Sequence, residues 1–251
     1  MHIKVQPLLF AAAIFAASSS QAATLVADYE FNGNLASSVA GAPDLIAIDP
    51  LGLNSFGAGV YNFGGANYPT GNQGGLAFDN SGGLISNTSY SIALRFLFND
   101  RDNAWRRIVD VQNRQSDSGF YVDPANSLDI YPITGSPATF TNGVFHDVLL
   151  TVDGGIAKAY LDGTLQFSTN TNVMNIDNPQ NVVNLFVDNV VAGGQGEWSS
   201  GTIDYAKFYN GVASIGGAVP EPATWAMMIL GFGMIGGTLR RRKAVDRLQA
   251  A

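Results

Sequence analysis

The feature that most constrains this chain is a two-residue alternation of apolar and polar side chains that recurs through its middle. Its clearest instance spans residues 91–99, where every second residue is Ile, Leu or Phe. Neighbouring side chains of a β-strand point to opposite faces, so this pattern is typical of a strand with one buried face. The same alternation appears in residues 25–32, 145–153, 156–168 and 202–209, and no helical pattern of useful length precedes residue 220. The middle of the chain is therefore predicted to be an all-β, two-sheet antiparallel β-sandwich.

Turn residues separate these predicted strands. The dipeptide Asp162-Gly163 lies between two alternating stretches, 156–161 and 164–168. Asp and Gly tolerate the positive φ angles of a two-residue hairpin turn. We therefore expect these two strands to form a β-hairpin.

Composition limits the chemistry of this middle segment. Residues 23–219 contain seven basic and eighteen acidic residues, which gives a net charge of −11. A field of this sign repels phosphate, so it argues against nucleic acid as a partner and favours Ca²⁺ or basic surfaces. The chain has no cysteine, which excludes disulfides and thiol chemistry.

The first 22 residues have the pattern of a secretory signal peptide. Lys4 precedes an apolar run from Leu8 to Ala17, which is too short to cross a bilayer, and Ser20-Gln21-Ala22 follows with small residues that suit signal peptidase. Export by the Sec machinery follows, with Ala23 as the first residue of the mature chain. A retained anchor helix is the alternative.

The other end of the chain combines three parts. Prolines lie at 220 and 222, an apolar stretch covers 223–239 with Trp225 near its start, and the basic cluster Arg240-Arg241-Arg242-Lys243 follows. This order predicts a linker at 214–219, a short transmembrane helix at 223–239 and a cytoplasmic tail at 244–251, because basic residues stay on the cytoplasmic side.

This C-terminal segment resembles the PEP-CTERM sorting signal over residues 220–243. The match rests on Pro220, Glu221, Pro222, Trp225, Arg240, Arg241 and Arg242. The resemblance implies recognition by an exosortase, transient anchoring in the inner membrane, and then release or transfer toward the cell surface. An ordinary single-pass anchor is the alternative.

The order of motifs in the middle segment resembles the laminin-G-like branch of the concanavalin A-like lectin/glucanase fold. Four stretches carry the resemblance, namely 28–35, 90–96, 145–163 and 201–209. It implies a jelly-roll sandwich over residues 23–213. Sugar binding, protein binding and glycan cleavage all occur in this fold, so the fold alone does not choose among them.

Paired catalytic carboxylates are missing from the sequence pattern. Glu30 and Glu197 are the only glutamates between residues 23 and 219, and neither lies in a Glu-x-Asp-x-Glu type of strand. Retaining glycosidases need two carboxyl groups about 5 Å apart. We therefore expect no enzyme activity. The single histidine of this segment, His146, is expected to be structural at the edge of the core.

One structural Ca²⁺ is the cofactor that the resemblance implies. Asp28 and Glu30 share a face of the first strand, and Asp204 lies on the last strand, which pairs near the first in this fold. Carboxylate oxygens are the ligands that calcium prefers. Asp28, Glu30 and Asp204 are therefore the predicted metal ligands, with ordinary solvated acids as the alternative.

Aromatic residues near predicted loops provide candidate sugar-binding residues. Trp105, Trp198 and Tyr121 are the predicted ligand-binding residues, because exposed aromatic faces stack on sugar rings. The sequence thus predicts a non-enzymatic envelope or extracellular-matrix protein that binds glycan or exopolysaccharide. A purely structural biofilm protein is the first alternative, and a glycan-cleaving enzyme the second.

Overall fold

Strands form almost all of the regular structure in the residues that the computed structural model describes, which are 23–135, 137, 139–191 and 195–214. The predicted signal peptide, the predicted spanning helix and the sorting segment lie outside these residues. Within the described ranges, the one helical element is the short 3-10 turn η1 (Thr70–Asn72), and no helix is long and apolar enough to cross a membrane.

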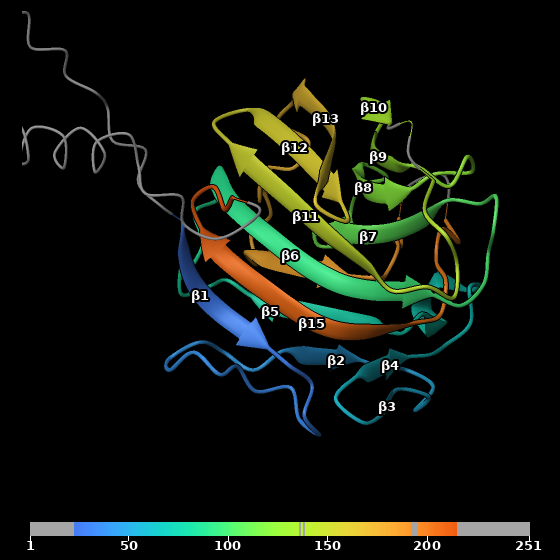
Figure 1. The fold of residues 1–251 in the computed structure, drawn as a ribbon. Coiled ribbons are helices and arrows are strands. Elements are labelled where there is room, and N and C mark those ends of the chain that lie inside the picture. The colour runs from blue at the N-terminus through green and yellow to red at the C-terminus, as the bar shows by residue number, and fades with distance from the viewer. Residues whose placement is uncertain (1–22, 136, 138, 192–194, 215–251) are drawn as a thin grey trace, which may run out of the picture. The chain divides into compact units, whose positions relative to one another are not determined.

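The first sheet, called sheet A, contains the longest strands. Its order is β13-β12-β11-β6-β15-β4-β3, and β1 also pairs with β15. Figure 1 shows β11, β6 and β15 side by side across the front of the domain. Its strands are β1 (Thr24–Tyr29), β3 (Ser55–Phe56), β4 (Tyr61–Phe63), β6 (Ser89–Phe98), β11 (His146–Asp153), β12 (Ile156–Leu161), β13 (Thr164–Asn170) and β15 (Gly201–Asn210).

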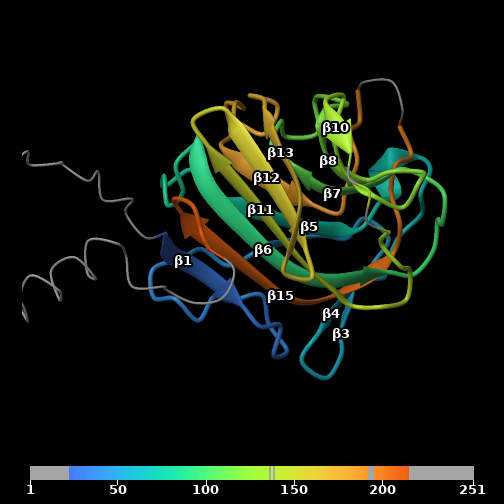
Figure 2. The same cartoon turned by 45° about the horizontal axis from the view of Figure 1, so that its top comes forward.

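The second sheet, called sheet B, lies behind sheet A in Figures 1 and 2, and its order is β10-β9-β8-β7-β14-β5-β2. Its strands are β2 (Ile46–Ile48), β5 (Gly75–Asp79), β7 (Arg106–Asp110), β8 (Gly119–Val122), β9 (Leu128–Tyr131), β10 (Thr134–Gly135) and β14 (Val182–Leu185). The pairs within both sheets are antiparallel. The prediction of a two-sheet antiparallel sandwich is confirmed.

The core lies between the two sheets and is rich in phenylalanine. The alternating residues of β6 predicted to face inward, Ile92, Leu94, Phe96 and Phe98, are all buried. Aromatic rings bridge the sheets: Phe208 of β15 stacks on Phe78 of β5 with ring centroids 4.1 Å apart. Stacked pairs at this spacing stabilise the packing beyond the area they bury.

A β-bulge in β15 corrects one detail of the predicted alternation. The sequence pattern put Ile203 on the same face as Tyr205, but the pairing with β6 shifts register between these two residues. The extra residue, Asp204, lets Ile203 stay buried while Tyr205 points outward.

The hairpin predicted at Asp162-Gly163 is confirmed. Both residues have positive φ angles, +48° and +80°, and Leu161 pairs with Thr164 across the turn. These angles suit a two-residue turn whose twist matches that of the flanking strands.

A buried ionic cluster centred on Arg107 fastens loops onto sheet B. The Arg107 guanidinium lies 2.6 Å from the carboxylate of Asp110 and 3.2 Å from that of Asp188, and all three side chains are fully buried. It also donates hydrogen bonds to the main-chain oxygens of Ser116 and Asp117. The cluster therefore joins β7 to the loop between β7 and β8 and to the loop that follows β14, which is distant in sequence.

Glu197 lies at the edge of this cluster. Its main-chain N–H donates to Asp188 Oδ2 at 2.8 Å. Burial and the neighbouring carboxylates of Asp188 and Asp117 raise the pKa of Glu197 to about 8, because Arg107 only partly offsets them. The folded protein thus holds this carboxyl group in its neutral form around pH 7.

Replacing Arg107 tests the cluster. Arg107→Met leaves Asp110 and Asp188 buried without their cation, so the free energy of unfolding is expected to fall by about 3–5 kcal/mol. Urea unfolding of the full chain in mild detergent, followed by tryptophan fluorescence, measures the change. The control is Lys158→Met, which removes a half-exposed cation and should stay within about 0.5 kcal/mol of wild type. A loss for Arg107→Met no larger than the control's would contradict this role.

The raised pKa of Glu197 makes the free energy of unfolding depend on pH. Its pKa is about 8 in the folded state against an ordinary 4.5, so the folded state binds the proton more tightly, and its contribution is lost as pH rises from about 4.5 to about 8. Glu197→Gln should flatten this part of the stability profile. Glu30→Gln is the matched control with the opposite sign, because the hydrogen bond from Lys207 lowers the pKa of Glu30. An unchanged profile in Glu197→Gln would contradict the assignment.

Candidate functional site

The outer face of sheet A carries a row of side chains that surrounds a small residue. Across the sheet, Tyr160 of β12 lies opposite Leu149 of β11, Leu149 opposite Ala93 of β6, and Ala93 opposite Lys207 of β15. Alanine leaves a low point between its larger neighbours. The strand register therefore builds a depression at the centre of the sheet.

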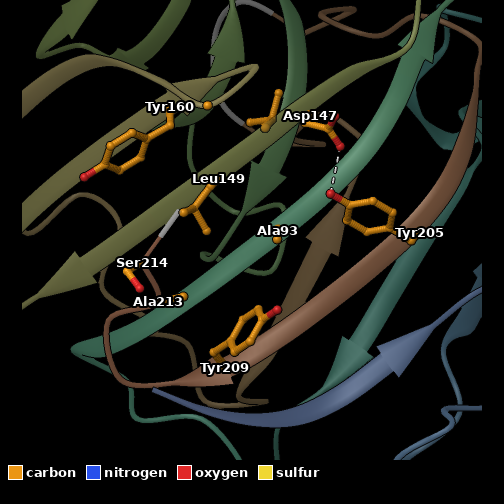
Figure 3. A pocket seen from close by; sticks show the side chains of 10 residues that line it. Ala93, Asp147, Leu149, Tyr160, Tyr205, Tyr209, Ala213 and Ser214 are labelled. Atoms are coloured by element: carbon orange, nitrogen blue, oxygen red, sulfur yellow. Dashed lines mark hydrogen bonds between the residues drawn. The ribbon is translucent and has the colours of Figure 1, made fainter. Parts of the chain in front are cut away.

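This depression is a pocket of about 190 Å³. Figure 3 shows Ala93 at its base, with Tyr205 and Tyr209 from β15 on one side and Leu149 and Tyr160 on the other. Clefts for drug-sized ligands measure roughly 300–1,000 Å³, so this pocket suits a single ring-sized unit. Its walls are aromatic and apolar, with polar groups at the rim.

Asp147 is the charged residue that lines the pocket, and its position is fixed by two neighbours. Tyr205 donates a hydrogen bond from its hydroxyl to Asp147 Oδ1 at 2.8 Å, drawn as the dashed line in Figure 3. Arg95 donates to Asp147 Oδ2 at 2.8 Å and also pairs with Asp204 at 3.1 Å. Burial and the hydrogen bond to Asp147 raise the pKa of Tyr205, so its ring and hydroxyl stay neutral and oriented.

The C-terminal end of the described chain forms another wall. After β15 the chain turns at Gly211, and the fully buried hydroxyl of Ser91 donates to Gly211 O at 2.9 Å and accepts from Ala213 N–H at 2.8 Å. Ala213 and Ser214 then line the pocket. Gly211 has a φ of +90°, a conformation that glycine adopts at little cost. Ser91 therefore pins this segment beside the tyrosines.

The predicted calcium ligands do not gather in one place. β1 does pair with β15, as expected, but Lys207 holds Asp28 at 3.3 Å and Glu30 at 2.9 Å, while Arg95 holds Asp204. Among the described residues, no group of three or more His, Cys, Asp or Glu side chains is arranged to bind a metal ion. Because cations already neutralise these carboxylates, the three residues do not fit a calcium site.

Two of the three predicted ligand-binding aromatics are buried. Trp198 is 3% exposed and donates from Nε1 to Gly74 O at 2.8 Å, and Tyr121 is fully buried with the Arg107 guanidinium 4.6 Å from its ring centroid. Neither presents a free face for stacking, because Trp198 packs against Gly74 and Tyr121, on strand β8, packs against the Arg107 guanidinium. Trp105 is half-buried and packs edge-on against Tyr131, which is 38% exposed.

His146 has the structural setting expected from the sequence. It is 8% exposed, its Nδ1 lies 2.7 Å from Asp162 Oδ2, and its Nε2 accepts from the Thr141 N–H at 3.1 Å. Since Nε2 accepts, the ring proton lies on Nδ1 and is donated to Asp162. Both ring nitrogens are used in holding loops to the end of β11.

The pocket tyrosines are not among the residues predicted from the sequence, although one pattern pointed to them. Alternation in residues 202–209 put Tyr205, Lys207 and Tyr209 on one face of the strand. The same period places Tyr160 outward on β12. Tyrosines on the polar face of a central strand indicate a ligand-binding surface. Only the strand order shows that β12 and β15, which carry these tyrosines, lie on either side of Ala93.

Family models match two parts of the chain. The model described as the concanavalin A-like lectin/glucanases superfamily matches residues 70–214, and that of the PEP-CTERM protein-sorting motif matches residues 218–243. Both agree with the resemblances found in the sequence. The sorting motif indicates an exported, membrane-transiting protein. No curated protein sequence matches the chain.

Solved structures share the fold at low sequence identity. Domain 4 of AbnA, an extracellular arabinanase from Geobacillus stearothermophilus in complex with arabinotriose, is 20% identical with a TM-score of 0.54, over 77% of this chain and 96% of that one. A botulinum neurotoxin type C structure is 13% identical with a TM-score of 0.51, over 76% and 49%. A Trypanosoma rangeli sialidase in complex with 2,3-difluorosialic acid is 12% identical with a TM-score of 0.54, over 75% and 31%.

These structures show the fold alone, and the family model covers more than half of the sequence. The chain therefore belongs to the concanavalin A-like lectin/glucanases superfamily and carries a PEP-CTERM protein-sorting motif at residues 218–243.

Proposed function

We propose that this protein binds glycan through the pocket on the outer face of sheet A. The observation that carries the proposal is the arrangement of Tyr160, Tyr205 and Tyr209 around the low point at Ala93, with Asp147 at the rim. Aromatic rings stack on the apolar faces of sugar rings, and oriented carboxylates accept hydrogen bonds from sugar hydroxyls. A pocket with both elements suits one sugar unit of a longer chain.

Asp147 retains the capacity to contact a ligand. One of its oxygens accepts from Tyr205 and the other from Arg95, but an ionised carboxylate offers about four acceptor positions. The two existing hydrogen bonds hold the group in place before a ligand arrives, which reduces the entropy lost on binding.

The structural neighbours support a carbohydrate ligand. The arabinanase domain is in complex with arabinotriose, and the neurotoxin structure concerns interaction with ganglioside molecules. The likeness between these proteins and this chain is one of fold, so the identity of the bound sugar comes from the pocket and from experiment.

The sorting motif indicates where the protein acts. We propose that the Sec machinery and signal peptidase act on residues 1–22, and that an exosortase recognises residues 218–243 after transient anchoring in the inner membrane. The folded domain then acts at the cell surface or in the extracellular matrix, where exopolysaccharide is the available glycan.

We propose a binding protein rather than a glycan-cleaving enzyme. Asp147 is the one acidic residue among those that line the pocket, and it is paired with Arg95, so the pocket lacks the two carboxyl groups that a retaining glycosidase needs. Glu197 has a raised pKa, but it belongs to the Arg107 cluster on sheet B and does not line the pocket.

A structural role without a ligand is a second candidate, supported by the edge strand β13. Its seven residues contain no charge and no proline, β12 is its one partner among the strands that the structure describes, and Leu165 is 49% exposed. Edge strands without charged residues or proline readily pair with another chain. Self-association with no glycan retention would favour this candidate.

Replacing a pocket tyrosine tests the binding site. Tyr209→Ala should weaken retention on an exopolysaccharide gel about tenfold, equivalent to roughly 1.4 kcal/mol, because it removes one stacking wall. Affinity electrophoresis of the full chain in mild detergent measures the dissociation constant for each polysaccharide. Tyr131→Ala is the matched control, since Tyr131 is also exposed but lies on sheet B. Loss of retention in Tyr131→Ala alone would move the site to Trp105 and Tyr131.

The wall built by residues 211–214 gives a separate prediction. Ser91→Ala removes the hydroxyl that joins Gly211 and Ala213, so glycan affinity should fall severalfold, with the unfolding midpoint changed by only a few degrees. Ser89→Ala is the control on the same strand, because its hydroxyl contacts only the exposed Asp153. Equal affinities in the two variants would show that this wall takes no part in binding.

A further inference from the structure

The basic groups beside the pocket are already paired. Arg95 contacts the carboxylates of Asp147 and Asp204, and Lys207 contacts those of Asp28 and Glu30. The Lys207 ammonium also lies 5.1 Å from the ring centroid of Tyr205. A ligand carboxylate would have to displace one of these partners to reach a cation.

Carboxylates dominate the surroundings of the pocket. Asp162 lies next to Asp147, because its carboxylate accepts a hydrogen bond from the main-chain N–H of Asp147 at 2.9 Å. It adds a fifth carboxylate to the four that are paired with Arg95 and Lys207. Five acidic side chains therefore surround two basic ones. Charges within a Debye length, about 8 Å at physiological salt, still interact, so this rim repels an anion.

Lys158 is the remaining basic side chain on this part of the outer face, within the residues that the structure describes. It lies on β12 two residues before Tyr160 and is half-buried. It pairs in register with Thr151, which is buried, and it does not line the pocket. An anionic unit stacked on the tyrosines would therefore face Asp147 rather than Lys158.

From these contacts we infer that the pocket selects an uncharged sugar unit and excludes uronic and sialic acids. The inference rests on the proposed glycan-binding function and names the ligand class of the same site. The tyrosines supply stacking that is independent of charge, and the rim supplies the selectivity by repulsion.

Two polymers with the same backbone, one acidic and one neutral, test this selectivity. Polygalacturonate and its carboxyl-reduced form share one backbone, and dextran and arabinan serve as further neutral probes. With the full chain in mild detergent, we expect at least one neutral probe to be retained. At low salt, we expect an acidic probe to bind at least about tenfold more weakly than the neutral probe. At about 0.5 M NaCl this difference in affinity should become smaller, because screening weakens the repulsion. An anion-binding site would respond in the opposite direction, because salt would weaken its binding of the acidic probe.

Two variants locate the cause. Asp204→Asn releases Arg95 from one partner without altering a residue that lines the pocket, so the ratio of neutral-probe to acidic-probe affinity should fall about threefold. The exposed Asp177→Asn makes the same charge change and should leave this ratio unchanged. If the acidic probe bound as tightly as the neutral probe or more tightly, and Lys158→Met abolished this binding, the charge selectivity would be overturned. The proposed glycan binding would still hold. Retention of no probe, neutral or acidic, would overturn the proposed function itself.

Discussion

The position of β15 is the constraint on which the rest of the structure depends. This last strand pairs along its whole length with β6 on one side, and with β4 and then β1 on the other. The bulge between Ile203 and Tyr205 coincides with the change of partner from β4 to β1. Sheet A therefore cannot be completed until the C-terminal end of the domain is in place.

The same strand also builds the candidate site. Its inward residues Ala206 and Phe208 join the core, while the outward Tyr205, Lys207 and Tyr209 face solvent beside Ala93. The chain then turns at Gly211 and crosses back over the sheet, so the pocket's final wall comes from the segment that leads toward the sorting motif at residues 218–243. Core packing and ligand contact are thus opposite faces of one strand.

Strand periodicity made the architecture predictable, and the chain's low helix propensity agreed with it. The inward residues of β6, the hairpin at Asp162-Gly163 and the pairing of the first strand with the last all followed from local pattern or from the family resemblance. The site was less predictable because it depends on which strands are neighbours. Trp198 is near a predicted loop in sequence, but folding buries it against Gly74, more than a hundred residues away. The ion pairs of the predicted calcium ligands were equally hidden from the sequence, since Arg95 and Lys207, which neutralise them, lie on neighbouring strands.

Methyl NMR during a titration shows whether ligand enters the pocket over Ala93. Ala93, Leu149 and Ala213 each place a methyl group at the pocket, whereas the exposed Ile133 lies in the turn between β9 and β10 of sheet B. With arabinotriose as the neutral probe, we predict saturable shifts of the Ala93, Leu149 and Ala213 methyl signals and none for Ile133. Saturable shifts confined to Ile133 and its neighbours would contradict the account.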